Sequence, residues 1–412
     1  MNEPLSTDPY KGVRDFYPAD WARIEAIFAR IQQTLALWGY EEYNASPLER
    51  AELYEAKTSE EIMSEQTYTF TDRGDRHVTL RPEMTPTLAR MVAGKRRELT
   101  FPLRWFSIGN RFRYERMQKG RLREFYQADI DLIGLPEGEA DIEIVRITSE
   151  ILKAFGASEN DFIIRMSSRA LLNAACRAAG LKGDDVKQYL RLLDKKAKMT
   201  PETFKAAREA ISPKKDPLSF TEPKTMESFI KTLKKRGVGN VVFDPSVTRG
   251  FDYYTGMVFE VYDTNPANPR AMFGGGRYDG LMALFGGDSI PAVGFAMGDV
   301  TLADFLTTHG LIPDGSSDKP QLYLGTPGVE NISAAQTFAD ILRKEDGRIF
   351  VNLTDRSLGD QIKDAVKRGI PLFIAYGADE VENRTVRMKV LATGEEIVLP
   401  VSELPARLRS GN

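Results

Sequence analysis

Two stretches between Leu103 and Gly134 alternate apolar and polar residues, which predicts the two strands of an antiparallel hairpin. In the second stretch one face is apolar and the other polar, formed respectively by Tyr126, Ala128, Ile130 and Leu132 and by Phe125, Gln127, Asp129 and Asp131. In the first stretch Arg111, Arg113 and Glu115 share one face, opposite Phe112 and Tyr114. Around Gly120 the connecting loop is basic, with Arg116, Lys119, Arg121 and Arg123. The pattern therefore predicts a hairpin with one face in the core and one face of charged, amide and aromatic groups.

Two interpretations of this hairpin are open on spacing alone. Lysine and arginine on an exposed edge strand can serve only to prevent aggregation. However, Arg113, Gln127 and Asp131 lie on the same face as a lone aromatic ring, Phe125, which is unusual for a purely structural strand pair. That combination favours an anion-binding site over an aromatic surface.

Elsewhere the periodicity alternates between helices and strands. Helical spacing is found at Trp21–Trp38, Ala140–Gly156 and, in an Ala-, Leu- and Lys-rich segment with few strand signals, at 170–236. Strand signals are found at Thr67–Phe70, Val78–Arg81, Phe162–Met166 and again from Asn240. We predict an α+β chain divided into 1–169, a helical insertion 170–236, a continuation 237–310, a linker 311–320 and a final domain 321–412. In the final domain alternating strands and helices predict a parallel sheet, to which a hairpin turning at Thr393 and Gly394 adds an antiparallel edge.

Composition narrows the possible chemistry. The 412 residues carry a net charge of -3, so any nucleic-acid contact must be local. One cysteine, Cys176 in a run of small residues, predicts a packed core residue, and only two histidines argue against zinc clusters and a Ser-His-Asp hydrolase. We place His77 in a turn and His309 near a helix end, both as structural residues. No apolar run reaches membrane-span length and no signal-peptide pattern opens the chain, so we expect a cytoplasmic protein.

Local motifs identify further candidates. Thr85 and Pro86 suit the N-cap and first turn of a helix, and Glu83 just before them fits either a cap or a binding site. Arg249 next to Gly250 can approach a phosphate closely. The glycines of FGGGRYDGL do not form a dinucleotide-binding loop, because the strand, helix and acidic residue that such a loop needs are missing, and no P-loop motif occurs.

The run FRYERMQKGRLREFYQ resembles motif 2 of class II aminoacyl-tRNA synthetases, most closely that of histidyl-tRNA synthetases. The resemblance implies a class II catalytic domain built on an antiparallel sheet flanked by helices, with a helical insertion that leans over the tRNA acceptor stem. It also implies that Arg113 contacts the ATP α-phosphate, Glu115 the adenine and Arg121 a further phosphate. Phe125 would stack on the adenine, and Gln118 would approach the acceptor end of the tRNA.

Other segments carry the same resemblance. TLRPEMT is similar to the family segment whose glutamate and threonine, here Glu83 and Thr85, hold the α-ammonium group of the amino acid. RGFDYYTG and GGRYDGL are similar to histidine-specific segments, which implies that Arg249 contacts the α-phosphate and the histidine carboxylate. The same segments supply Tyr253, Tyr254 and Tyr278 to the histidine pocket, with Tyr254 on the imidazole. Gln127 would bind the ammonium end, and Asp131, where the family has glutamate, would select the imidazole.

Three further segments extend the resemblance, one of them with a departure. KGVRDFYP resembles the family's opening signature, and GYEEYNASPLERAELY resembles motif 1, which implies a homodimer interface near Pro47. IPAVGFAMGDVTLADF corresponds to motif 3, but Thr301 stands where the family has a phosphate-binding arginine. Arg116 or Arg277 is then the candidate to replace that cation. The final domain is similar to anticodon-binding domains, with candidate RNA contacts at Arg343, Lys344, Arg348, Arg356 and Arg387.

The resemblance implies ligation of histidine to tRNA(His), with histidine, ATP as its Mg²⁺ complex and tRNA(His) as substrates. It implies no organic cofactor, no metal held by protein ligands and no membrane partner. One alternative is a non-catalytic paralogue, the regulatory subunit of ATP phosphoribosyltransferase, which the loss of the motif 3 arginine favours. Another is a tRNA-binding module without activity.

Overall fold

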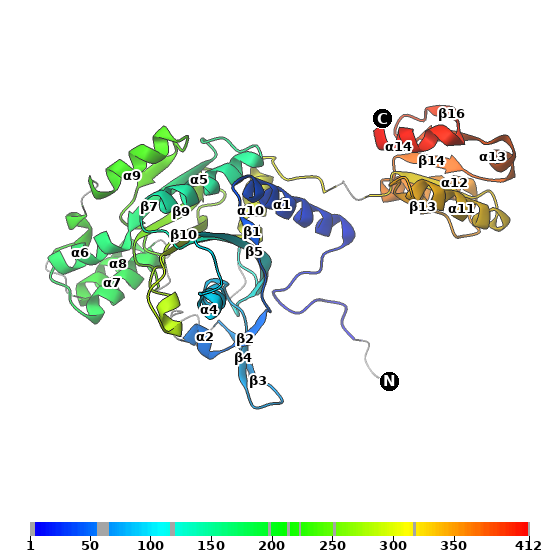
Figure 1. Ribbon diagram of the computed structural model, residues 1–412. Helices are drawn as coiled ribbons and strands as arrows, with labels where there is room; N and C mark the ends of the chain where they lie inside the picture. Colours follow the sequence, from blue (N-terminus) through cyan, green and yellow to red (C-terminus); the bar gives the residue numbers. More distant parts are fainter. Residues whose placement is uncertain are drawn as a thin grey trace. The chain divides into compact units, whose positions relative to one another are not determined.

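The computed structural model describes residues 5–55, 66–115, 120–196, 199–211, 215–221, 224–249, 253–315 and 319–410. The chain forms two compact units, Met1–Asp314 and Gly315–Asn412. Each unit has its own sheet and its own core (Figure 1). The finer domain limits expected from the sequence stay a prediction.

An eight-stranded sheet organises the first unit, in the order β1-β5-β6-β11-β10-β9-β7-β8. Its strands are β1 (Glu41–Glu42), β5 (Leu103–Phe112), β6 (Glu124–Ile133), β7 (Phe162–Ser168), β8 (Val241–Phe243), β9 (Met257–Asp263), β10 (Ala271–Arg277) and β11 (Ala292–Gly298). The central neighbours pair antiparallel, while β1 joins β5 and β8 joins β7 in parallel. The antiparallel sheet and the β5–β6 hairpin predicted from the alternation are both confirmed.

Helices cover both faces of this sheet. The larger core lies on the face covered by α1 (Pro18–Leu37), α5 (Glu139–Ala154), α9 (Lys224–Lys235) and α10 (Asp299–Thr308). Alternation along β6 explains the division, because Ile130 and Leu132 enter that core while Ile133 packs on the other side. There α4 (Thr85–Lys95) covers the sheet (Figure 1), with Leu88 and Val92 buried against Val258.

A small three-stranded sheet stands beside α4, in the order β2-β4-β3, next to the short helix α2 (Glu52–Glu55). It consists of β2 (Leu48–Arg50), β3 (Tyr68–Thr71) and β4 (His77–Leu80). The predicted hairpin is present, and its turn is closed by Asp72, whose carboxylate accepts the backbone N–H groups of Gly74 and Arg76 at 2.8 and 3.0 Å. His77 begins β4, so its placement in the turn was wrong by a residue.

The segment after β7 is helical, as predicted. It holds α6 (Arg169–Ala178), α7 (Asp184–Lys195), α8 (Pro201–Ile211) and the 3-10 turn η2 (Pro217–Phe220). These elements bury a core of their own around Cys176, Tyr189 and Leu193, so Cys176 is the packed residue that its surroundings indicated. By contrast, α9 places Met226 and Leu233 in the main core and therefore packs with the sheet.

The second unit has a five-stranded sheet in the order β13-β12-β14-β15-β16. Its elements are β12 (Leu322–Gly325), α11 (Ile332–Arg343), β13 (Ile349–Val351), α12 (Leu358–Arg368), β14 (Leu372–Ala375), α13 (Ala378–Asn383), β15 (Thr385–Val390), β16 (Glu396–Pro400) and α14 (Leu404–Ser410). The first three strands pair in parallel and the β15–β16 hairpin adds an antiparallel edge, as predicted. Two apolar clusters fill its faces, one around Phe338 and Ile374 and one around Tyr323 and Phe373.

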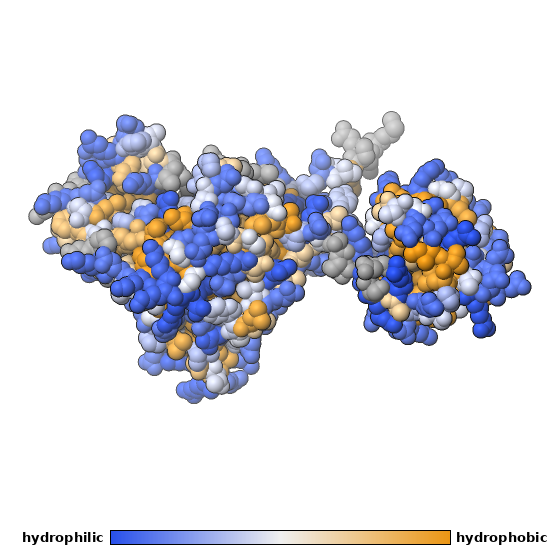
Figure 2. Space-filling model, turned by 90° about the horizontal axis from the view of Figure 1, so that it is seen from above, coloured by the Kyte–Doolittle hydropathy of each residue, from blue (hydrophilic) through white to orange (hydrophobic). Residues whose placement is uncertain are grey.

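The visible surfaces of the two units are similar in hydropathy. Hydrophilic residues cover most of the face of each unit seen in Figure 2, and hydrophobic residues form smaller patches between them. Among the helices of the described residues, none is both long and apolar enough to cross a membrane.

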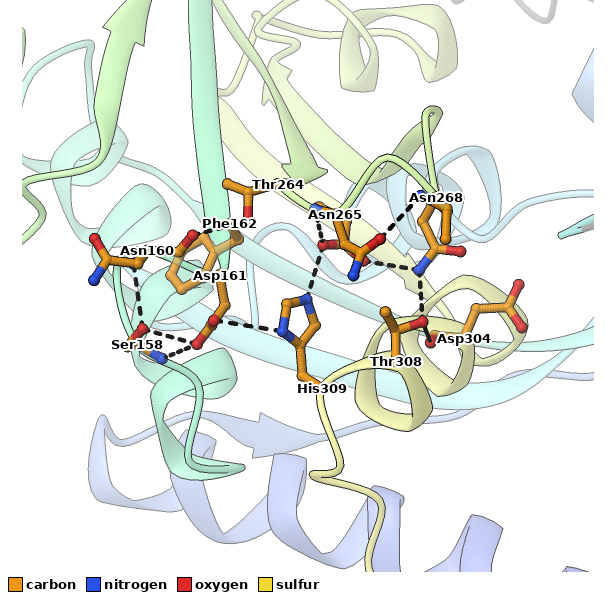
Figure 3. A network of polar contacts seen from close by, with 12 residues as sticks. Ser158, Asn160, Asp161, Phe162, Thr264, Asn265, Asn268, Asp304, Thr308 and His309 are labelled. Atoms are coloured by element: carbon orange, nitrogen blue, oxygen red, sulfur yellow. Dashed lines mark hydrogen bonds and ion pairs between the residues drawn. The ribbon is translucent and has the colours of Figure 1, made fainter.

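A polar network fixes the end of α10 to two strands (Figure 3). His309 places Nε2 2.8 Å from Asp263 at the end of β9 and Nδ1 3.4 Å from Asp161 just before β7. Asn268 donates to Asp263 at 2.8 Å and to Thr308 at 3.1 Å. His309 thus holds a helix end against the sheet, which fits the structural role predicted for it.

Arg277 at the end of β10 forms an ion pair that is almost fully enclosed. Its guanidinium donates to both oxygens of Asp141 at 2.9 and 2.7 Å and also reaches Asp279 at 2.9 Å. The side chains of Arg277 and Asp141 are 1% and 0% exposed. Because this arginine is fully engaged in joining the sheet to α5, it does not replace the missing motif 3 arginine.

We predict that Arg277→Ala lowers the free energy of unfolding by about 3–5 kcal/mol, because the buried Asp141 carboxylate loses its guanidinium partner. Chemical denaturation followed by circular dichroism measures the loss. Arg236→Ala is the matched control, since Arg236 pairs with the exposed Glu139 and its removal should leave stability nearly unchanged. Equal stability of the two variants would contradict the structural role assigned to Arg277.

Candidate active site

A cavity lies on the face of the sheet where the predicted polar side chains gather. The cavity is lined by the described residues that the resemblance assigned to histidine and ATP: Glu83, Thr85, Arg113, Glu115, Arg121, Phe125, Gln127, Asp131, Arg249, Tyr253, Tyr254 and Tyr278. Gln118 and Arg116 lie outside the described residues. Remote segments therefore meet at one place, as the contact between Tyr253 and Glu83, 170 residues apart in sequence, illustrates.

Asp131 marks the deep end of the cavity. It is 4% exposed and accepts a 2.5 Å hydrogen bond from the hydroxyl of Tyr278. Gly294 lies directly opposite on β11, where a β-carbon would collide with the Asp131 carboxylate. Burial raises the pKa of Asp131 to about 8, the Tyr278 hydrogen bond opposes this, and the nearby Asp129 charge adds to it.

Glu83 lies beside this end and is also buried. Its Oε2 accepts the hydroxyl of Tyr253 at 3.0 Å. Burial, together with the Glu83 charge, raises the pKa of Tyr253 well above its usual value, so this hydroxyl stays protonated. The expectation that Thr85 caps the following helix was wrong, because α4 begins at Thr85 itself and Met84 holds the cap position.

A layer beneath the cavity was missed by the sequence analysis. Arg111 is fully buried and its guanidinium lies 2.6 Å from Asp129, which in turn accepts a hydrogen bond from Gln127 at 2.7 Å. This chain of contacts fixes the orientation of the Gln127 amide. The signal was present in the alternation, since Asp129 lies between Gln127 and Asp131 on the polar face.

The shallower end of the cavity is cationic and aromatic. The Arg113 guanidinium lies 5.4 Å from the centroid of the Phe125 ring, and its Nε donates to the carbonyl of Pro82 at 2.9 Å. Arg121 contacts Glu115 at 2.8 Å. The arrangement provides a flat ring, a carboxylate and two guanidinium groups, which suits a planar base attached to an anion.

Arg249 reaches the cavity from the segment between β8 and β9. Its backbone is left-handed, with φ 57°, an unusual conformation for a residue with a side chain. Its guanidinium contacts Glu260 at 3.1 Å and the carbonyl of Gly274 at 3.3 Å, and its buried Nε has no hydrogen-bond partner among the described residues. A β-carbon at position 274 would crowd both the Phe259 carbonyl and this guanidinium, so the glycine gives Arg249 its place.

Thr301 lines the cavity at the start of α10. Its hydroxyl donates to the carbonyl of Met272 at 2.7 Å. Its methyl group lies beside Gly120, where a β-carbon would be 3.4 Å from it. Asp299, the first residue of α10, accepts the backbone N–H of Tyr126 at 2.9 Å and pairs with Arg14 at 2.7 Å. The opening segment of the chain is therefore tied to this helix start, a link that no local pattern revealed.

Among the described residues, no group of three or more histidine, cysteine, aspartate or glutamate side chains could hold a metal ion. The cavity lining has arginines at one end and the buried carboxylates Glu83 and Asp131 at the other. It can bind a compact polar group carrying N–H donors at the Asp131 end and an anion joined to an aromatic base at the Arg113 end. Between them, positive charge can stabilise a developing negative charge.

Comparisons with known proteins agree with this arrangement. Residues 12–215 and 197–300 match the family model described as histidyl-tRNA synthetase, and residues 322–411 match that of an anticodon binding domain. The chain is 38% identical to a histidine–tRNA ligase of Leptospira biflexa, covering 99% of this chain and 98% of that protein. It is 33% identical to a chloroplastic/mitochondrial histidine–tRNA ligase of Arabidopsis thaliana, covering 98% and 87% of the two chains.

Solved structures share the fold. The apo histidyl-tRNA synthetase of S. aureus aligns with a TM-score of 0.76 at 23% identity, covering 98% of this chain and all of that one. The histidyl-tRNA synthetase of Nostoc sp. aligns with a TM-score of 0.77 at 22% identity, covering 98% and 99%.

We predict that Asp131 titrates near pH 8 in the ligand-free protein. Since its folded pKa lies above its unfolded value, its contribution to stability is complete below about pH 4 and is lost as the pH rises through about 8, by up to about 1.4 kcal/mol per pH unit. NMR of carboxyl-labelled aspartate measures the titration, and the resonance with the high midpoint should vanish in Asp131→Asn. Titration of every aspartate below pH 6 would contradict the burial of this carboxyl.

Proposed function

Because the chain belongs to the histidyl-tRNA synthetase family, we propose that its cavity joins histidine to tRNA(His) in two steps. The histidine carboxylate attacks the α-phosphorus of ATP, the bond to the β-phosphate breaks, and pyrophosphate leaves. The terminal ribose hydroxyl of tRNA(His) then attacks the acyl carbon, and AMP leaves. The observation that carries this proposal is the meeting of Arg113 and Arg249, from distant parts of the chain, in one cavity whose other end holds Asp131.

The alternative, a regulatory subunit of ATP phosphoribosyltransferase, is less supported. The match extends over nearly the whole length of ligases such as that of Leptospira biflexa and includes an anticodon-binding domain, which we do not expect in such a subunit. A Bacillus halodurans structure described as an ATP phosphoribosyltransferase regulatory subunit/histidyl-tRNA synthetase aligns with a TM-score of 0.66 at 23% identity, which speaks for a shared fold only.

Histidine would bind at the deep end. We assign its α-ammonium group to Glu83, Thr85 and Gln127, since a buried carboxylate and an oriented amide oxygen accept N–H donors. We assign its imidazole to Asp131, Tyr254 and Tyr278. A pocket built on paired buried polar groups rejects analogues that leave these groups unpaired, which gives selectivity for histidine.

ATP, as its Mg²⁺ complex, would bind at the cationic end. Phe125 offers its ring to the adenine and Glu115 accepts the exocyclic amino group, while Arg121 binds a terminal phosphate. Arg113 and Arg249 would approach the α-phosphate from two sides. Positive groups fixed before the reaction stabilise the pentacoordinate transition state without reorganising, and this is their main catalytic contribution.

The remaining contacts follow from the same family membership. Gln118 would approach the acceptor end, and the second unit would bind the anticodon. We also propose a homodimer formed through the region near Pro47 and a cytoplasmic location.

We predict that Arg249→Ala lowers histidine-dependent exchange of labelled pyrophosphate into ATP by about 10²- to 10³-fold, equal to about 3–4 kcal/mol in the barrier. The circular dichroism spectrum should stay unchanged. Arg146→Ala is the matched control, because Arg146 lies over the Trp38 ring, 4.9 Å from its centroid, outside the cavity. Exchange at the wild-type rate in Arg249→Ala, or none in the wild type, would contradict the proposed function.

Arg121 should bear the phosphate contact that Thr301 cannot make. Removing a charge-assisted hydrogen bond costs about 1.5–3 kcal/mol, so Arg121→Ala should raise the KM for ATP by about 10- to 100-fold in the same exchange assay. The KM for histidine should change little, since Arg121 lies at the other end of the cavity. An unchanged KM for ATP would show that another cation fills this role.

A further inference from the structure

Two buried charged residues next to Gln127 have no assigned role toward a ligand. Asp129 is 3% exposed, lines the cavity and lies on the same face of β6 as Gln127. Arg111 on β5 is 0% exposed. One oxygen of the Asp129 carboxylate accepts from the Arg111 guanidinium at 2.6 Å, and the other accepts from Nε2 of Gln127 at 2.7 Å. Both oxygens of this carboxylate are therefore engaged, one of them by a side chain of the cavity.

Asp129 decides which atom of the Gln127 amide faces the cavity. A carboxylate paired with a guanidinium can only accept hydrogen bonds, so it binds the amide nitrogen and not the amide oxygen. No described residue donates a hydrogen bond to the amide oxygen, Oε1, and Gln127 itself lines the cavity. This oxygen is thereby left to accept from a ligand.

Two cations make this orientation depend on Asp129. Gly109 lies directly opposite Gln127 in the hairpin, and a β-carbon there would be 2.7 Å from Nη2 of Arg81 and 3.5 Å from Nη1 of Arg111. Burial, together with the Arg111 charge, lowers the pKa of Arg81 to about 10. Positive charge attracts an amide oxygen, so without the Asp129 carboxylate the amide would turn its nitrogen toward the cavity.

The direction of this amide matters for the group that the pocket accepts. An α-ammonium group carries three N–H donors and a positive charge, and it pairs with acceptor oxygens such as those of Glu83 and Gln127. A hydroxyl in its place donates only once, so it leaves an acceptor unpaired. An amide turned the other way would repel the ammonium group and donate to the hydroxyl.

We propose that Asp129 and Arg111 are positioning residues that set the selectivity of the pocket. They present the Gln127 oxygen to the cavity and thereby select an α-amino acid over the corresponding α-hydroxy acid. The inference rests on the proposed function, in which Gln127 binds the ammonium group of histidine. Asp129 and Arg111 act on that group only through Gln127.

The test replaces Asp129 by asparagine, which has nearly the same shape. The oxygen of the new side chain can still accept from Arg111, and its NH₂ group then faces Gln127, where only the amide oxygen can accept. In Asp129→Asn the Gln127 nitrogen therefore turns toward the cavity. Ser107→Ala is the matched control, because Ser107 lies directly opposite Asp129, is fully buried and has a hydroxyl without a hydrogen-bond partner among the described residues.

Calorimetry measures the affinity of the full-length protein for L-histidine and, by competition, for L-β-imidazolelactate, in which a hydroxyl replaces the ammonium group. In Asp129→Asn we expect histidine to bind about 10- to 100-fold more weakly and imidazolelactate to stay within about threefold of the wild type. The affinity for α,β-methylene-ATP should not change. Ser107→Ala should match the wild type for all three ligands.

An unchanged ratio of histidine to imidazolelactate affinity in Asp129→Asn overturns the proposal, and so does an equal loss for histidine and α,β-methylene-ATP. If circular dichroism shows that this variant does not fold, Arg111→Met/Asp129→Asn replaces it. That double variant buries no unpaired guanidinium and leaves the amide free to turn, so the ratio should fall there too. A wild type that binds no histidine overturns the proposed function as well, whereas normal histidine binding with an unchanged ratio overturns this proposal alone.

Discussion

The buried contact between Arg111 and Asp129 is the constraint on which the polar face of the sheet depends. Two unit charges with almost no exposure to water are stable only when each finds a partner, and removing one would cost about 3–5 kcal/mol. Because Gln127 donates to the same carboxylate, the pair also sets the direction of a cavity side chain. The hairpin can therefore turn a row of polar groups inward without leaving a buried charge unpaired.

Around this pair the two ends of the cavity have opposite electrostatic character. At the Asp131 end burial favours neutral forms, which raises the pKa of that carboxyl and of the Tyr278 hydroxyl. At the other end the guanidinium groups of Arg113 and Arg121 lie 4.0 and 2.8 Å from the Glu115 carboxylate. This difference between the two ends would orient a ligand that carries a ring N–H donor and an anion.

Much of the fold and the site could be predicted because the signals are local. Alternation in β6 assigned each residue to a face, and the segments carrying Glu83, Arg249 and Tyr278 could each be identified on their own. Contacts between remote segments could not be predicted in this way. The pairing of Arg277 with Asp141 joins residues 136 positions apart, and the tie between Arg14 and Asp299 spans 285. Arg277 was therefore named, beside Arg116, as a candidate for the phosphates, although it is enclosed in an ion pair with Asp141.

Gly276 on β10 and Gly294 on β11 lie opposite each other in the sheet, next to Asp131. At position 294 the Asp131 carboxylate and the Ile130 carbonyl occupy the space of a β-carbon, so main chain lines the cavity there. Main chain paired on both sides in a sheet has no side-chain rotamers to rearrange, so this part of the lining is rigid. How far the carboxylate extends into the cavity is then set by the length of the acidic side chain, and at position 131 this protein has the shorter aspartate.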